Sequence, residues 1–525
     1  MPPLTRRSLL ESLLAFSALA ALPVKAQEAQ QPETAPPVQG FRFDDVVRRA
    51  RELSALPFDG TPPQLPEPLN NLDFDRWRDI RFRPERALLT SGGGQFRLQL
   101  FHLGFLYQRP VTVNVIREGL PTPVPYQREL FDYGRNQFDK PFPVNLGFAG
   151  FRLHTPLNTP KVFDELISFL GASYFRFLGR DQKYGLSARG LAINVVGSEP
   201  EEFPYFREFW IETPAPEAQQ ATIYALLDGA STTGAYRFDV HPAAETSIDV
   251  TAVLFPRRTL TYVGLAPLTS MFFHGESDRR RANDYRPEVH DSDGLLMHSG
   301  GGEWLWRPLR NPAETRVSSF HDNNPRGFGL MQRDRVFEDY QDLEAYYHRR
   351  PGYWVEPVGD WGEGRVELVE IPTDDETHDN IVAYWRPNHP LEQGQEATFT
   401  YRMRAMLSEA EMHPGGMAIN TFQTTPRASG SSAPWDPTHR RFIIDFAGGP
   451  LAYYLPDPAQ VQLVPSTSAG EITHTFLVPN TYTKGFRAAI DVRLPEGQST
   501  DLRAFLRAGS RALTETWTFP WRSGQ

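Results

Sequence analysis

The sequence predicts an all-β protein in which a large β-sandwich is followed by a smaller, immunoglobulin-like one. Its 525 residues include 47 prolines, 40 glycines and 12% aromatic residues, a composition typical of a turn-rich globular β protein. From about residue 75 the chain consists mainly of short runs in which apolar and polar residues alternate, separated by Gly, Pro, Asn and Asp. Helical patterns are few, so we expect antiparallel sheets to form most of the fold.

The first 40 residues have the features of an export signal and a flexible leader. Arg6 and Arg7 form a twin-arginine pattern, which precedes an apolar run over residues 13–22 and a small-residue cleavage site ending at Ala26. We expect a twin-arginine signal peptide over 1–26, with an ordinary secretory signal as the alternative, and a flexible leader over 27–40. The apolar run is shorter than the roughly 20 residues a membrane-spanning helix needs. The sequence therefore predicts a periplasmic protein that does not span the membrane.

Ordered structure is expected to begin near Phe41. Apolar residues at helical spacing predict helices over residues 43–53 and over residues 161–170, where Pro160 can start the helix. Strands are predicted over residues 96–103, 112–116, 222–227, 246–255, 365–371, 397–404, 441–446 and 487–494. A polar segment over 386–395, rich in Pro and Gly, predicts a large domain over 41–392 and an immunoglobulin-like domain over 393–525.

Composition excludes several classes of function. The formal net charge is −10 and no long basic run occurs, so the sequence lacks the electrostatic footprint of a nucleic-acid-binding protein. With no cysteine, the chain cannot contain disulfides, thiolate nucleophiles or Cys-ligated metals. His290, His298 and His378 do not have zinc-motif spacing, and the Gly300-Gly301-Gly302 run lacks the residues of a phosphate loop. We expect no cofactor and no metal.

Acidic residues are crowded into two segments, 283–295 and 370–385, and two tryptophans, Trp304 and Trp306, follow the first. Sugar sites commonly combine carboxylates with aromatic faces, and glycoside hydrolysis requires two carboxyl groups in different protonation states. Simpler interpretations stay open, because Asp, Ser and Gly also form ordinary turns and the two indoles at strand spacing could belong to the core. Neither segment completes an EF-hand calcium loop.

Long stretches at and around these segments resemble one known family. The stretches cover residues 172–176, 184–192, 266–271, 285–294, 302–309 and 370–385. They are similar to the OpgG/OpgD (MdoG/MdoD) family of periplasmic glucan biosynthesis proteins, and the twin-arginine start is more like the OpgD branch. The resemblance implies a galactose-mutarotase-like large sandwich and an activity in making osmoregulated periplasmic glucans.

The resemblance also implies a reaction and its residues. Family members are similar to inverting hydrolases of β-1,2-glucan, which would make Asp379 the general acid and Asp291 the general base. Glu376 and Tyr347 are candidates for positioning substrate or relaying a proton. Weaker candidates for sugar contacts are Tyr285, Arg286, Trp304 and Trp306. Two alternatives to hydrolysis are a non-catalytic glucan-binding scaffold for branching or modification and, by analogy of fold alone, aldose epimerisation. Expected partners are β-1,2-glucan and possibly other glucan biosynthesis proteins.

Overall fold

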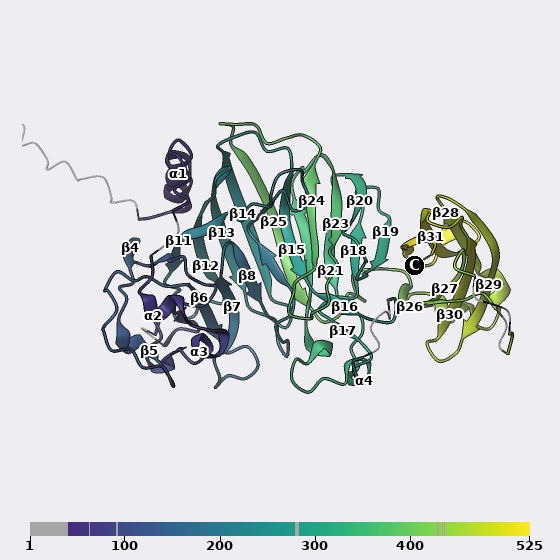
Figure 1. The fold of residues 1–525 in the computed structure, drawn as a ribbon, viewed down its shortest axis with the longest axis horizontal. Coiled ribbons are helices and arrows are strands. Elements are labelled where there is room, and N and C mark those ends of the chain that lie inside the picture. The colour runs from purple at the N-terminus through teal and green to yellow at the C-terminus, as the bar shows by residue number, and fades with distance from the viewer. Residues whose placement is uncertain are drawn as a thin grey trace, which may run out of the picture. The chain divides into compact units, whose positions relative to one another are not determined.

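The computed structural model describes residues 40–524 except 62–63, 91–92, 279–282, 428–429, 433 and 435. The predicted signal peptide and almost all of the predicted leader lie outside the described residues. The chain from Phe41 onward forms one compact unit. Strands dominate this unit, so the all-β prediction is confirmed (Figure 1).

Two large sheets form the main sandwich. In the described part of the chain, the first sheet contains, in spatial order, β2 (Arg97–Phe101), β6 (Gly150–Thr155), β7 (Asp164–Leu170), β8 (Tyr174–Phe177), β9 (Ser187–Arg189), β15 (Val263–Ser270), β24 (Ile381–Pro387), β23 (Glu363–Glu370) and β20 (Arg316–Asn323), with β10 (Leu191–Ile193) paired to β15. Its strand pairs are antiparallel, for example Val369 opposite Val382. Leu268 and Ala383 of this sheet share one buried core with Ile223 and Val250 of the other.

The second sheet continues from the main sandwich into the C-terminal region. In spatial order it contains β28 (Gln462–Thr467), β31 (Ser499–Ala508), β33 (Thr516–Arg522), β19 (Trp304–Pro308), β18 (Gly294–His298), β21 (Gly327–Met331), β22 (Gly352–Val358), β25 (Ala397–Met406), β14 (Ser247–Pro256), β13 (Thr232–His241), β12 (Ala221–Asp228), β11 (Tyr205–Glu212), β3 (Thr112–Arg117) and β4 (Leu120–Pro123), with β32 (Arg511–Ala512) paired to β31. The parallel pair β19–β33, with Leu305 opposite Thr516, joins the two regions.

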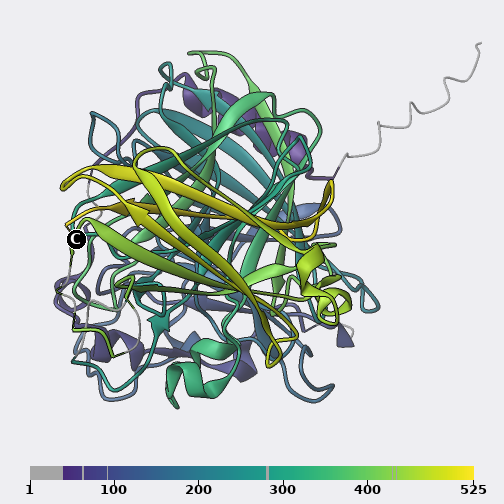
Figure 2. The ribbon, with the colours of Figure 1, turned by 90° about the vertical axis from the view of Figure 1, so that its right-hand side faces the viewer.

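The smaller sandwich is C-terminal. A sheet of β26 (Met417–Thr424), β27 (His439–Ala447), β30 (Gly485–Arg493) and β29 (Glu471–Asn480) shares a second buried core with β28, β31 and β33. Phe442 of β27 lies against Trp517 and Phe519 of β33, with ring centroids 6.2 and 5.5 Å apart. In Figure 2 the yellow C-terminal strands of this sandwich face the viewer. Two facing antiparallel sheets agree with the expected immunoglobulin-like architecture.

The predicted domain boundary falls too early. The strand expected to open the second domain, residues 397–404, is β25, which pairs with β14 and β22 of the main sandwich. Tyr401 and Met403 of β25 are buried in the core of the large sandwich, because alternate residues of a strand face the same side. The larger sandwich therefore extends through Met406 and not only to residue 392.

The helices are short. They are α1 (Phe43–Ser54), α2 (Glu67–Asn70), α3 (Phe74–Arg78) and α4 (Phe337–Tyr340), with 3₁₀ turns η2 (Pro84–Arg86), η4 (Arg128–Leu130), η5 (Tyr347–Arg349), η6 (Leu451–Tyr454) and η7 (Pro458–Gln460). The predicted helix near residue 43 is confirmed. At its start the backbone N–H of Arg42 donates to Asp45 Oδ2 over 2.9 Å, and Val46 and Ala50 bury its apolar face against Trp210 of β11.

The helix predicted over residues 161–170 is wrong. The structure has strand β7 there, between β6 and β8, with Phe169 opposite Phe151 and Phe175. A short apolar run satisfies helical and strand periodicity equally well, and here the neighbouring strands decide the outcome. Two short strand pairs complete the description of the sheets. They are β1 (Arg81–Phe82) with β5 (Phe131–Asp132) and β16 (Phe272–His274) with β17 (Val289–His290).

Candidate active site

Asp379 lies at the end of the turn between β23 and β24. The next residue, Asn380, is only 2% exposed and fixes this turn to β16. Its Oδ1 accepts a hydrogen bond from the Phe272 N–H over 2.8 Å, and its Nδ2 donates to the carbonyls of Phe272 and Ile371, each over 3.0 Å. The position of Asp379 is therefore set by hydrogen bonds of its neighbour.

Asp291 follows β17 and is buried. Its backbone N–H donates to the Met271 carbonyl over 2.8 Å, and Arg350 Nη1 donates to its Oδ1. Met271 and Phe272 are consecutive, so one short backbone stretch anchors the turn of Asp379 and the segment of Asp291. The two predicted acids thus come from sequence positions almost 90 residues apart and share one support.

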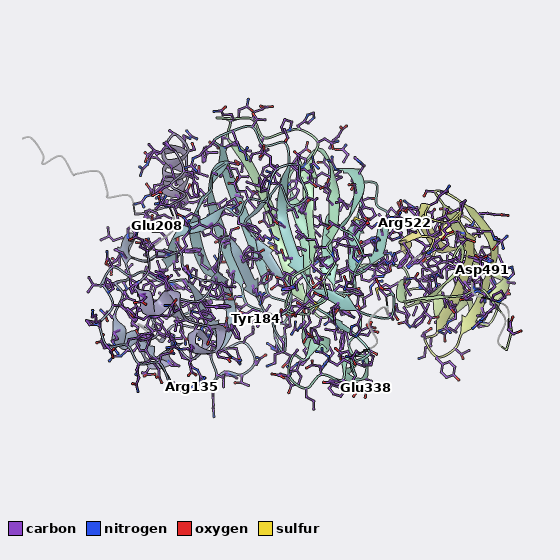
Figure 3. All side chains as sticks on the ribbon, viewed as in Figure 1. Arg135, Tyr184, Glu208, Glu338, Asp491 and Arg522 are labelled. Carbon is purple, nitrogen blue, oxygen red and sulfur yellow. The ribbon has the colours of Figure 1, made fainter. Side chains whose placement is uncertain are left out.

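An open cleft of about 530 Å³ contains Asp379. Arg176 of β8 and Tyr184, which is labelled in Figure 3, line it as well. Asp379 is accessible to solvent, yet the protein atoms around its carboxyl group raise its pKa by desolvation. The charge of Arg176 lowers this pKa and that of Asp291 raises it, which places both groups within electrostatic reach of Asp379.

Glu376 and Tyr347, both predicted as site residues, are in direct contact. The Tyr347 hydroxyl donates to Glu376 Oε2 over 3.1 Å, and Arg286 Nη1 lies 2.8 Å from the same oxygen. The Arg350 guanidinium lies over the Tyr347 ring, 4.1 Å from its centroid, and so connects this pair to Asp291. Burial raises the pKa of the Tyr347 phenol, and the charge of Asp291 raises it further.

Arg286 is held firmly within this group. Hydrogen bonds to Asp284, Glu376 and Asp342 raise its pKa despite partial burial. Its shortest ion-pair contact is to Asp284, 2.7 Å, and the contact to Asp342 is 3.1 Å. Because Asp342 in turn accepts backbone N–H bonds from Glu344 and Ala345, Arg286 positions Glu376 from a rigid base.

The remaining predicted sugar contacts differ in their surroundings. Tyr285 is 77% exposed next to Arg286. Trp306 is buried in the second core under Arg333, whose guanidinium lies 3.4 Å from a ring centroid of the indole. Trp304 stacks on His298 with centroids 4.1 Å apart. Neither indole lines the cleft that contains Asp379, so the structure does not bring them together with the acids.

One group of described residues has the composition of a metal site. Ligand atoms of Glu288, His290, Asp293 and Asp334 all lie within 4.8 Å of one another. Burial lowers the pKa of His290, but the charges of Asp293 and Glu288 and a hydrogen bond that the imidazole donates to Glu288 outweigh burial and raise it to about 9. A protonated imidazole therefore supplies positive charge inside this group, which lies beside Asp291 in the sequence.

Sequence reasoning missed several residues of the site. Arg350 was not selected, because only the folded chain brings it to Asp291. Tyr107 and Arg152, which line the cleft, lie outside the family-like stretches. Tyr174, Arg176 and Tyr184 lie within those stretches, so the resemblance could have indicated them.

Fold and site together define a two-sandwich β protein with one acid, Asp379, at an open cleft and a second, buried acid, Asp291, anchored to the same short backbone stretch. The chain belongs to the periplasmic glucan biosynthesis protein family MdoG, whose family model matches residues 41–521. The predicted family is thereby confirmed.

Curated relatives carry both names of this family. Glucans biosynthesis protein G of Ralstonia nicotianae is 47% identical, covering 91% of this chain and 95% of its own. Probable glucans biosynthesis protein D of Shewanella oneidensis is 43% identical, covering 93% of this chain and 90% of its own. The closer likeness to the OpgD branch stays a prediction.

The solved structure of a galactose mutarotase related enzyme of Lactobacillus acidophilus aligns with 50% of this chain and 91% of that enzyme's chain, at 8% identity and a TM-score of 0.22. Within the described residues, no helix is both long enough and apolar enough to cross a membrane.

Proposed function

We propose that the protein is a periplasmic, inverting, endo-acting hydrolase of β-1,2-glucan that acts in the synthesis of osmoregulated periplasmic glucans. Asp379 is the general acid and Asp291 the general base. The observation that carries this proposal is the shared support of the two acids on Met271 and Phe272, combined with different surroundings for the two carboxyl groups.

An inverting hydrolase needs a protonated carboxyl group at the glycosidic oxygen and a carboxylate that activates water on the opposite face of the sugar. Asp379 suits the first role because desolvation raises its pKa and the open cleft gives a substrate access to it. Asp291 suits the second role because it is held in an ion pair with Arg350 and does not line the cleft itself.

Asp291 is buried, so a proton must travel between the attacking water and its carboxylate. A bridging water passes this proton to Asp291, and Tyr347 is placed to position that water, because its ring lies on Arg350, the partner of Asp291, and its hydroxyl donates to Glu376. In this scheme Glu376 orients Tyr347 or a sugar hydroxyl, and Arg286 holds Glu376 in place. Tyr285, exposed beside Arg286, remains a proposed sugar contact, whereas Trp304 and Trp306 do not line the cleft and have no part in this scheme.

The test is to incubate the purified protein with linear β-1,2-glucan and measure released reducing ends. Asp379→Asn should lower the rate by at least about 100-fold, the usual contribution of a general acid, while glucan binding persists. Asp374→Asn, an exposed acid of the same turn, is the matched control and should retain the activity. NMR of fresh product should show the inverted, α anomer.

Two results would contradict the proposal. Asp379→Asn cleaving as fast as the parent would remove the acid assignment, and a product of retained configuration would remove the inverting mechanism. If the parent binds glucan tightly but releases no oligosaccharide, and Asp291→Asn changes nothing, the protein is the glucan-binding scaffold.

A further inference from the structure

A second cavity adjoins the cleft that contains Asp379. It measures about 370 Å³, and both volumes lie in the range of ligand sites, about 300 to 1,000 Å³. The two cavities share Leu106, Tyr107, Leu170, Gly171, Ala172 and Tyr174 as lining residues. We call the second cavity the distal pocket; Phe58, Arg109, Phe203 and Tyr205 line it and do not line the cleft.

Tyr107 and Tyr174 stand at the junction and are linked electrostatically to Asp379. Burial raises the pKa of each phenol, and the charge of Asp379 raises both further. The Tyr107 ring is fixed by Trp77, 4.7 Å away between centroids. It also covers Gly171, whose φ is +79° and where an added Cβ would lie 3.2 Å from Tyr107 Cε1. A ligand leaving Asp379 toward the distal pocket therefore meets two well-placed aromatic rings.

Guanidinium groups pack on the aromatic rings that line the junction and the distal pocket. The Arg189 guanidinium lies 4.9 Å from the Tyr174 ring centroid and 5.4 Å from that of Phe203. Arg189 is itself buried and fixed, because it donates to Thr269 Oγ1 over 2.8 Å and to Glu201 over 2.7 Å. Arg109 stacks on Tyr205 at 4.6 Å.

These surfaces suit a neutral sugar. Phe203 is 50% exposed, so its ring is open to stacking by a ligand. The one carboxylate of the lining, Glu202, already accepts from the Ser231 backbone N–H over 2.9 Å and from the Ser231 hydroxyl. Aromatic faces with the Arg109 guanidinium and no uncommitted carboxylate offer stacking and hydrogen bonds to hydroxyl groups.

We propose that the distal pocket binds glucose units of the same glucan chain, on one side of the bond held at Asp379 and beyond the Tyr107–Tyr174 junction. The identity of the ligand rests on the proposed function. The placement implies that affinity depends on chain length: a long glucan fills the cleft and the distal pocket, whereas a short oligosaccharide fills the cleft alone. The distal pocket would then set how many sugars the protein requires on that side.

The test measures binding separately from cleavage. Phe203→Ala and Arg109→Gln are made in the Asp379→Asn protein, and calorimetry follows binding of long linear β-1,2-glucan and of the disaccharide and trisaccharide. Each variant should bind the long glucan about tenfold more weakly, as expected for loss of an interface anchor, and the short sugars with unchanged affinity. Tyr482→Ala, at a 98% exposed aromatic of the smaller sandwich, is the control and should change neither.

In the cleaving parent, Phe203→Ala should raise KM for long glucan about tenfold at unchanged kcat. Unchanged affinity for long glucan in both variants would overturn the proposal, as would an equal loss for short and long sugars, or no glucan binding at all. If the parent cleaves nothing but the length-dependent loss of affinity is found, the distal pocket stands and hydrolysis fails. If the parent cleaves glucan and both variants bind it as tightly as their background protein does, hydrolysis stands and the distal pocket fails.

Discussion

Asn380→Ala should destabilise the fold and disable the site, although Asn380 touches no substrate in the proposed mechanism. The substitution removes three hydrogen bonds, with the Phe272 N–H, the Phe272 carbonyl and the Ile371 carbonyl. Each is worth about 1 kcal/mol net, and a buried group left unpaired costs about 1 to 3 kcal/mol more. At a side chain that is only 2% exposed, we expect a loss of about 3 to 5 kcal/mol in the free energy of unfolding.

Urea denaturation followed by tryptophan fluorescence measures this loss, and the rate of glucan cleavage measures its effect on the site. Asn388→Ala is the matched control, because the exposed Asn388 side chain accepts a bond from Arg365 over 3.1 Å and its loss should cost under about 0.5 kcal/mol. The cleavage rate of Asn380→Ala should fall even under conditions where the variant is folded, because the turn of Asp379 loses its hydrogen bonds to β16. An Asn380→Ala protein with parental stability and activity would refute the argument that Met271 and Phe272 position the two acids.

Two further predictions concern buried charge. The pKa of His290 is raised from its ordinary 6.5 to about 9. The stability that protonated His290 contributes should therefore be complete below pH 6.5 and lost as the pH rises through 9. Urea denaturation across this window should show the loss, and in His290→Gln the dependence of stability on pH should be smaller. A parent whose stability is flat from pH 6.5 to 9 would contradict this. Arg333→Met should lower the free energy of unfolding by about 3 to 5 kcal/mol. The substitution removes the guanidinium that contacts the buried Glu409 and Glu515 at 2.6 and 2.7 Å. The exposed pair of Arg503 with Glu303 provides the control, where Arg503→Met should cost about 1 kcal/mol or less; equal losses would refute the distinction.

The elements that could be predicted are those whose sequence pattern is compatible with only one type of secondary structure. Alternation over residues 246–255 could only be a strand, and β14 is there. The run over residues 161–170 is compatible with a helix or a strand, and pairing with β6 and β8 makes it a strand. The domain boundary failed for a related reason: nothing local in residues 397–404 reveals that their partners are β14 and β22.

The site divides in the same way. Asp379, Asp291 and Glu376 lie within family-like stretches, whereas Tyr347, a candidate that also follows from the resemblance, lies outside them. Arg350 could not be predicted, because its relation to Asp291 depends on the packing of η5 against the segment after β17. The role of Asn380 was equally hidden, since its partner Phe272 lies 108 residues away.

Charge balance around the acids argues for a neutral ligand. Asp291 is paired with Arg350, Glu376 with Arg286 at 2.8 Å, and Glu165 in the cleft with Arg152 at 3.0 Å. Each of these three acids therefore contacts a guanidinium, although Arg286 also pairs with Asp284 and Asp342. Ion pairs within the protein thus occupy the carboxylates that a cationic ligand would need. Asp379 departs from this pattern, because among the described residues no ion pair holds it, and the charges of Arg176, Arg189 and Arg350 do not outweigh the desolvation that raises its pKa. The acid to which we assign the proton is thus one that the nearby arginines influence without forming an ion pair in the part of the chain that the structure describes.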